Sequence, residues 1–439
     1  MSTLKAIGSG LYPGVGPGTA TAARPSGRKH RVMVSMVAVA LAAVLVLALC
    51  IFAVTSKESL RRATPSDAVG WTLETVDNTA NSGWFTSIDV DSSDYVHIAY
   101  CNYPLVGDED LMYATNSGGS WACQTLYSDG RVGSHTSIAL DADDNVHISY
   151  LNDTDGDLNY ATNAEGSWAN YTIDGLGSVG AFSSIAVDSD NNVHISYYDG
   201  STMSLNYATN ASGLWVVYDQ LDGKFGIDIG QYTSIAVDAS DDVHISYYSV
   251  IARDLKYITN SGGSWATPIV LDRYGDVGKG TSIAVDSNGY VHISYYNYSA
   301  RDLKYATNST GSWANYTLDG KGLANDVGMF SSIALDADDD VHISYSNESS
   351  GDLMYATNAG GSWAIYTIDS TGWVGAHNSI ATDSLGHVHI SYFDDTNTAL
   401  KYATNGVVIP EFPLAGVATV VIASVCILAA LRRRAIEDQ

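Results

Sequence analysis

The chain has few basic residues, few cysteines and no helical pattern in its central part. Lysine and arginine number 21 among 439 residues, against 48 aspartates and glutamates, so the formal net charge is −27. Residues 70–406 hold 43 of these acidic residues and 10 of the basic ones. So large an acidic excess argues against nucleic acid as a partner. It favours solubility in salt or association with cations.

What the chain has in abundance is one repeated unit. Val-His-Ile-Ser-Tyr, with small changes, occurs seven times at a spacing of about 49 residues. Its histidines are His97, His147, His194, His244, His292, His342 and His389. Each copy follows Ser-Ile-Ala-Val-Asp and an acidic turn, and precedes Leu-x-Tyr-Ala-Thr-Asn, a glycine turn and Ser-Trp, again with small changes. The repeat predicts one small folding unit used seven times.

Each of these segments predicts a short β-strand, because β-branched and aromatic residues alternate within it and Gly, Asn and Asp bound it. In the third repeat the predicted strands are 184–188, 193–198, 205–210 and 215–219. Four antiparallel strands repeated at this period are typical of a β-propeller blade.

The number of strands indicates how the ring closes. The tryptophan strand occurs seven times, but its first copy, at 71–76, precedes the first histidine unit, and no copy follows the last one. We therefore predict an all-β, seven-bladed propeller over residues 70–406, in which the N-terminal strand completes the last blade and hides its edge.

With this arrangement Cys101 and Cys123 lie in the second and fourth strands of one blade. Their Cα atoms are then about 9–10 Å apart, beyond the ~6.8 Å limit for a disulfide. We expect free thiols. The total of four cysteines is also too small for a disulfide framework.

An apolar run precedes the propeller. Residues 1–31 predict a disordered tail ending in basic residues, and residues 55–69 predict a polar linker. The uncharged residues 32–54 between them are long enough to span a bilayer. They predict a transmembrane anchor or a secretory signal, and the length favours the anchor.

A second apolar run follows the propeller. Residues 407–413 predict a linker containing Pro-Glu-Phe, residues 414–431 a transmembrane segment, and residues 432–439 a basic tail. Basic residues outside both apolar runs predict two cytoplasmic tails and an extracellular propeller, with the lipid bilayer as partner. The Pro-Glu-Phe motif, the apolar run and the arginines together resemble the PEF-CTERM sorting tails of archaeal surface proteins. That resemblance implies an archaeal source and removal of the tail by a sorting enzyme.

Seven histidines in register suggest a metal ring, but neighbouring blades pack about 10 Å apart. Equivalent histidines therefore cannot converge on one ion, and hydrogen bonding within each blade is the preferred interpretation.

The acidic turns suggest calcium. Three of them match the opening Asp-x-Asp-x-Asp/Asn of a calcium loop: Asp141, Asp143 and Asn145; Asp188, Asp190 and Asn192; Asp336, Asp338 and Asp340. None is followed by the bidentate carboxylate that such a loop uses. Plain turns are the preferred interpretation, with weak calcium binding as the alternative. No other cofactor is predicted.

The turn before each tryptophan resembles the Asp-box of sialidase-like propellers, Ser-x-Asp-x-Gly-x-Thr-Trp. The first copy ends at Trp121 and has Ala114 and Asn116 where the box has Ser and Asp. The resemblance implies the propeller fold and a structural role for the turn. Sialidase catalysis would need three converging arginines and a tyrosine nucleophile with a glutamate partner. The few arginines and glutamates of residues 70–406 do not predict such a set.

One position varies from blade to blade in a way that suggests binding. It follows a glycine, just before each predicted first strand, and is occupied by Phe85, His135, Phe182, Tyr232, Gly280, Phe330 and His377. We expect these connections to reach the mouth of the central channel, where aromatic rings could stack on a sugar or simply pack to seal the channel. Arg273 and Lys279, close to Gly280, could orient an anionic or hydroxyl-rich ligand.

The sequence thus predicts a membrane-anchored extracellular propeller for recognition, adhesion or envelope structure, with a glycan or an envelope protein as partner. The alternative is a glycosidase or lyase on the same scaffold, because a propeller fold alone does not decide function.

Overall fold

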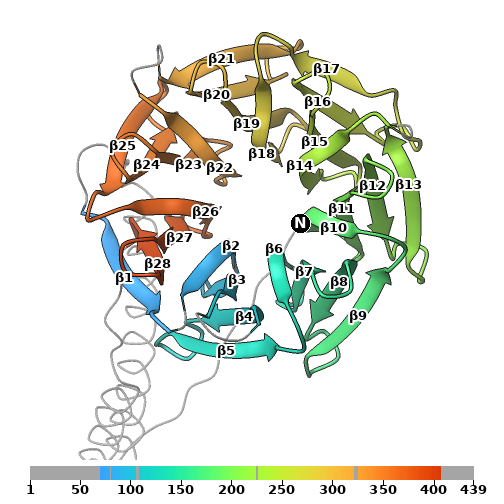
Figure 1. Cartoon of the computed structure of the whole chain (residues 1–439). Coiled ribbons are helices and arrows are strands. Elements are labelled where there is room, and N and C mark those ends of the chain that lie inside the picture. The colour runs from blue at the N-terminus through green and yellow to red at the C-terminus, as the bar shows by residue number, and fades with distance from the viewer. Residues whose placement is uncertain (1–69, 80, 105–107, 224–225, 321–324, 407–439) are drawn as a thin grey trace, which may run out of the picture. The chain divides into compact units, whose positions relative to one another are not determined.

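The computed structural model describes residues 70–79, 81–104, 108–223, 226–320 and 325–406. These residues form seven four-stranded antiparallel sheets arranged around a central channel (Figure 1). The prediction of an all-β propeller with seven blades is confirmed.

The four strands of each blade are arranged side by side, and the first lies nearest the channel. The innermost, first strands are β2 (Ser82–Val90), β6 (Val132–Leu140), β10 (Val179–Val187), β14 (Ile229–Val237), β18 (Val277–Val285), β22 (Val327–Leu335) and β26 (Val374–Thr382). The second strands are β3 (Val96–Asn102), β7 (Val146–Asn152), β11 (Val193–Asp199), β15 (Val243–Ser249), β19 (Val291–Asn297), β23 (Val341–Asn347) and β27 (Val388–Asp394). The third strands are β4 (Asp110–Thr115), β8 (Asp157–Thr162), β12 (Ser204–Thr209), β16 (Asp254–Thr259), β20 (Asp302–Thr307), β24 (Asp352–Thr357) and β28 (Ala399–Thr404). The outermost, fourth strands are β5 (Ala122–Tyr127), β9 (Ala169–Asp174), β13 (Val216–Asp222), β17 (Ile269–Asp272), β21 (Ala314–Asp319), β25 (Ala364–Asp369) and β1 (Thr72–Asp77).

The N-terminal strand closes the ring, as predicted. β1 pairs antiparallel with β28, with Thr72 opposite Thr404, and Figure 1 shows blue β1 beside red β28. Trp71, just before β1, packs against Tyr355 of the sixth blade at 5.3 Å between ring centroids. The last blade therefore consists of strands from both ends of the domain.

The same tryptophan–tyrosine contact joins every pair of neighbouring blades. Centroid distances are 5.0–5.3 Å in the pairs Trp71–Tyr355, Trp121–Tyr402, Trp168–Tyr113, Trp215–Tyr160, Trp265–Tyr207, Trp313–Tyr257 and Trp363–Tyr305. Angles of 59–73° between the ring planes put them near the edge-to-face arrangement that aromatic pairs prefer.

The histidines of the repeat are buried within their own blades. In the second blade His147 Nδ1 lies 2.5 Å from the hydroxyl of Tyr160 in the next strand, and His147 Nε2 lies 3.1 Å from Asp141 Oδ2. The same histidine–tyrosine contact recurs in all seven blades. The prediction of hydrogen bonding within each blade is confirmed.

The expectations for the two ends of the chain concern residues outside the described ones. The tails, linkers and apolar runs predicted there are residues 1–31, 32–54, 55–69, 407–413, 414–431 and 432–439. Within the part of the chain that the structure describes, no helix is long and apolar enough to cross a membrane. Cys101 and Cys123 are free thiols, as predicted, the first buried and the second exposed.

Removing the closing strand tests the ring. Deletion of residues 70–77 should lower the free energy of unfolding by several kcal/mol, because it exposes β28 and removes the Trp71–Tyr355 contact. Trp71→Ala alone should cost roughly 2 kcal/mol, since Trp71 is only partly buried. Urea denaturation followed by tryptophan fluorescence measures both. A chain that begins at Gly70 is the control, and equal stability of the deletion and this control would contradict closure by β1.

Candidate functional site

The seven variable positions lie inside the first strands rather than in the connections before them. Strand β10 begins at Val179, five residues before the predicted start, and Phe182 falls where its register against β11 shifts, between Ala181 and Ser184. The predicted strand start was wrong because this bulge interrupts the alternation by which a strand is recognised in sequence. The seven residues nevertheless line one cavity of about 200 Å³ in the channel.

All seven residues have a left-handed backbone, with φ between 50° and 56°. Only glycine adopts this conformation freely, and bulky residues are held there at a cost of about 1–3 kcal/mol. A glycine two residues earlier brings each strand close to the preceding blade. A Cβ on Gly230, for example, would lie 2.6 Å from the backbone nitrogen of Leu205. The packing of the blades therefore imposes the left-handed bulge whatever side chain it carries.

Six of these side chains form an arc of touching rings, which we call the aromatic arc. In order it comprises Tyr232, Phe182, His135, Phe85, His377 and Phe330. Neighbouring ring centroids are 4.5–4.8 Å apart. Gly280 occupies the seventh position, between Tyr232 and Phe330, and leaves the arc open there.

The residue after each arc position also lines the cavity and is small and polar: Thr86, Thr136, Ser183, Thr233, Thr281, Ser331 and Asn378. Most of these side chains bond across to the neighbouring blade. Thr233 Oγ1, for example, donates to Ser196 Oγ at 2.8 Å. Sequence reasoning missed these residues, although a Thr, Ser or Asn after each arc position was a visible signal.

Among the described residues, those that line the cavity carry no ionised side chain. None of them is a carboxylate, a lysine or an arginine. Burial between neighbouring rings lowers the pKa of His135 and of His377 to about 4, so both imidazoles are neutral at pH 7. Burial likewise raises the pKa of the Tyr232 hydroxyl. The electrostatic character of the cavity is therefore neutral and aromatic.

Three polar groups of the arc have no hydrogen-bond partner among the described residues. Within the part of the chain that the structure describes, no side-chain hydrogen bond engages the imidazoles of His135 and His377 or the hydroxyl of Tyr232. A neutral imidazole offers one donor and one acceptor, and a phenol can serve as either. The arc thus combines apolar ring faces with a few unpaired polar atoms.

Lys279 and Arg273, the two basic residues predicted beside the gap, do not lie with the arc in the cavity wall. Lys279 Nζ lies 3.1 Å from Asp276 Oδ2 and 4.0 Å from the ring centroid of Tyr298. Arg273 is exposed in the connection from β17 to β18. Neither residue lines the cavity, so the structure does not bring them together with the aromatic residues.

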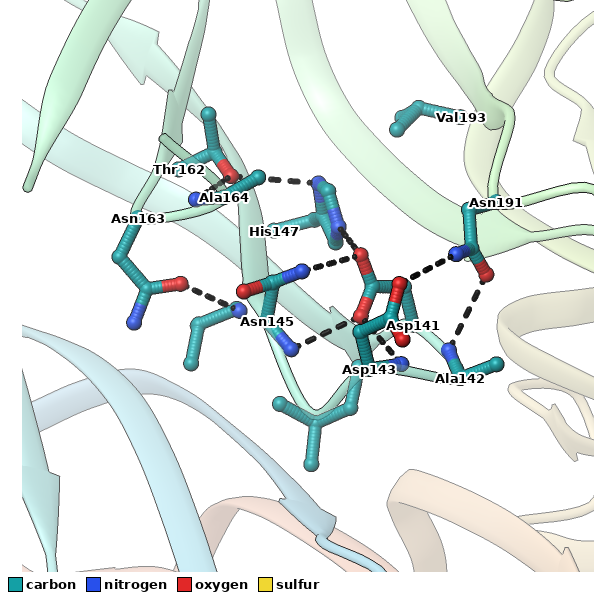
Figure 2. A network of polar contacts seen from close by, with 12 residues as sticks. Asp141, Ala142, Asp143, Asn145, His147, Thr162, Asn163, Ala164, Asn191 and Val193 are labelled. Atoms are coloured by element: carbon teal, nitrogen blue, oxygen red, sulfur yellow. Dashed lines mark hydrogen bonds and ion pairs between the residues drawn. The ribbon is translucent and has the colours of Figure 1, made fainter. Parts of the chain in front are cut away.

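The acidic turns lie at the other end of the first strands from the arc, and Figure 2 shows one of them. Asp141 Oδ1 accepts hydrogen bonds from the backbone amides of Asp143 and Asn145, and Oδ2 accepts from the Asn145 side chain and His147. Burial acts to raise the pKa of Asp141, but these hydrogen bonds outweigh it and hold the pKa below its usual value. Both oxygens of this carboxylate therefore already have partners.

The remaining acidic turns repeat this arrangement and join neighbouring blades. Asp188 and Asp336 bond the histidines of their own blades, His194 and His342, at 2.9 and 3.2 Å. The amides of Asp190, Asn192, Asp338 and Asp340 point to the same two carboxylates. Across the blade boundary, Asn191 Nδ2 donates to Asp143 Oδ2 at 3.1 Å, as Figure 2 shows. Among the described residues, no group of three or more His, Cys, Asp or Glu side chains is arranged to hold a metal.

Weak calcium binding stays the alternative to plain turns, and a melting experiment distinguishes the two. If the turns serve only to hold the blades, millimolar Ca²⁺ and Mg²⁺ at equal ionic strength should give the same melting temperature, and a chelator should change nothing. A rise with Ca²⁺ alone would show ions bound to the folded state. Asp143→Asn and Asp338→Asn, which retain the turn geometry, should then abolish that rise.

No protein-family model matches the chain, and no curated protein matches it. Among solved structures, the chain is similar to an ulvan lyase of polysaccharide lyase family PL25, with 12% identity, coverage of 73% of this chain and 93% of that one, and a TM-score of 0.51. The chain is also similar to a hydrazine synthase chain of Kuenenia stuttgartiensis. The two are 8% identical, the match covers 73% of this chain and 95% of that one, and the TM-score is 0.50. The leech intramolecular trans-sialidase gives 10% identity, 74% and 68% coverage, and a TM-score of 0.41. At these identities the likeness concerns the propeller fold alone.

Proposed function

We propose that this protein recognises a carbohydrate in its central cavity. The observation that carries the proposal is the aromatic arc. Its six rings line a cavity whose described lining residues include no ionised group, and His135, His377 and Tyr232 carry unpaired polar atoms. Sugars have apolar faces that stack on aromatic rings and hydroxyls that bond to neutral donors and acceptors. The arc supplies both kinds of contact.

Charge favours a neutral ligand over an anionic one. Residues 70–406 carry 43 acidic and 10 basic residues, and their field repels anions. An anionic sugar would need a cation in the cavity wall to offset this repulsion, and neither Arg273 nor Lys279 lines it. The position of these two residues does not support their predicted role in orienting an anion. Tyr232 and Phe330 do line the cavity, which supports the stacking of a ligand on their rings.

Binding fits the cavity better than catalysis. Glycoside hydrolysis generally uses two carboxyl groups on either side of the scissile bond, and the described part of the cavity lining contains none. A lyase needs a base with a pKa near the working pH. With pKa values of about 4, the imidazoles of His135 and His377 are weak bases. A carbohydrate-active enzyme is thus the second candidate, favoured only by the fold that the chain shares with an ulvan lyase.

We further propose that the propeller is displayed on the outer side of a membrane, in recognition, adhesion or envelope structure. The apolar residues 32–54 and 414–431, the basic residues beside them and the acidity of residues 70–406 support this location. The PEF-CTERM resemblance of the C-terminal end supports a cell-surface protein.

The exposed thiol of Cys123 provides a test of this location. A membrane-impermeant maleimide should label Cys123 in intact cells if the propeller lies outside, and only after lysis if it lies inside. Burial raises the pKa of this thiol, so labelling is best done at about pH 8. Cys123→Ser is the control for the other cysteines, and buried Cys101 should react only after denaturation.

Substitutions in the arc test the carbohydrate site. Tyr232→Ala and Phe330→Ala should each reduce binding to the best glycan of an array at least tenfold, about 1.4 kcal/mol, because each removes a stacking ring. Tyr316→Ala, on an exposed outer strand, is the matched control and should keep full binding. Unfolding of both arc variants, together with no glycan bound by the wild type, would instead make the arc a sealed core.

A further inference from the structure

The gap at Gly280 has the shape of one missing side chain. The φ of Gly280 is 54°, within the 50–56° range of the six arc residues. A Cβ built on Gly280 would meet no atom closer than the backbone nitrogen of Phe330, at 3.8 Å. The fold therefore provides the same position in the fifth blade as in the other six, and there it is empty.

The size of the gap follows from the spacing of the arc. Neighbouring ring centroids are 4.5–4.8 Å apart. In a closed ring of seven such positions, the two on either side of an empty one are roughly 8–9 Å apart, which leaves room for one six-membered ring between Tyr232 and Phe330. The cavity of about 200 Å³ is smaller than the range of about 300–1,000 Å³ found for drug-sized ligands. A cavity of this size suits one ring better than several linked rings.

The sides of the gap offer contacts that a sugar can use. Tyr232 contacts Phe182 in the arc and Phe330 contacts His377, while no ring contact joins Tyr232 to Phe330. Each residue at the gap therefore has a neighbour in the arc on one side only. The Tyr232 hydroxyl, which has no side-chain partner among the described residues, lies on one of these two rings.

We infer that a single terminal pyranose of the ligand occupies the Gly280 gap and completes the aromatic arc. This inference rests on the carbohydrate function proposed above. The pyranose stacks between Tyr232 and Phe330 and bonds to the Tyr232 hydroxyl. The protein accordingly recognises the end of a glycan chain, because an internal residue, linked on both sides, would have to pass through a space that holds one ring. Glycine in the fifth blade makes the site available.

Filling the gap tests this inference in the full chain, purified in detergent. Gly280→Phe adds the missing ring at a position whose backbone already accepts phenylalanine in three other blades. It should fold, melt at or above the wild-type temperature, and lose at least tenfold in affinity for methyl pyranosides. Gly280→Ala is the matched control, since it removes the glycine and adds only one methyl group, whose nearest neighbour is the backbone nitrogen of Phe330 at 3.8 Å. It should stay within about threefold of wild-type affinity.

Two probes separate the gap from the carbohydrate function. A panel of neutral methyl pyranosides and p-cresol, a flat ring of similar size, are tested by saturation-transfer NMR and titration. Pyranoside binding to wild type and Gly280→Ala but not to Gly280→Phe supports the inference. Equal pyranoside binding to all three overturns the gap while the carbohydrate function stands.

The remaining outcomes bear on the proposed function itself. Binding of p-cresol, but of no pyranoside, to wild type and Gly280→Ala would overturn the carbohydrate function, and the pyranose with it. Loss of that binding in Gly280→Phe would then show that the gap takes a different kind of ring. If neither probe binds the wild type, both proposals are overturned and the arc is a seal of the channel.

Discussion

Contact between neighbouring blades is the constraint on which the whole molecule depends. A four-stranded sheet exposes two faces, and no blade buries them alone. The hydrophobic clusters accordingly combine two blades, so that Tyr113 of the first blade packs with Ile148 and Tyr150 of the second. Near the channel the serine of each first strand accepts a hydrogen bond of 3.1–3.3 Å from a backbone amide of the next blade, seven times around the ring. Together these contacts join each blade to both of its neighbours.

This constraint also explains the strain at the channel. Close packing of the blades forces a bulge into every first strand, and the bulge turns one residue per blade into a left-handed conformation. If the backbone alone mattered, glycine would suit all seven positions. Aromatic residues occupy six of them, so the side chains contribute more than the strain costs, through packing, ligand contact or both. The fifth blade shows what the position looks like without a side chain.

The blade count, the closing strand and the role of the histidines could be predicted from the sequence, because each depends on residues that recur in every repeat. The start of the first strands could not, since Gly180 and Phe182 break the alternation with two positive φ angles. The arc residues could be located in the sequence because each lies at a variable position two residues after a glycine that recurs in every repeat. That they touch each other was not predictable, and neither was the course of Lys279, whose side chain turns to Asp276 and Tyr298 instead of the cavity.

The pairing of Thr72 with Thr404 has a mechanical consequence. Because β1 and β28 are antiparallel, the chain enters and leaves the propeller at the same end of one ladder. A force that pulls the two termini apart loads the hydrogen bonds of this ladder one after another, so they break in sequence from the end at Thr72 and Thr404. Strands sheared along their length would share the load among all bonds at once. A pull in the same direction on both termini does not separate β1 from β28, so it does not open this ladder.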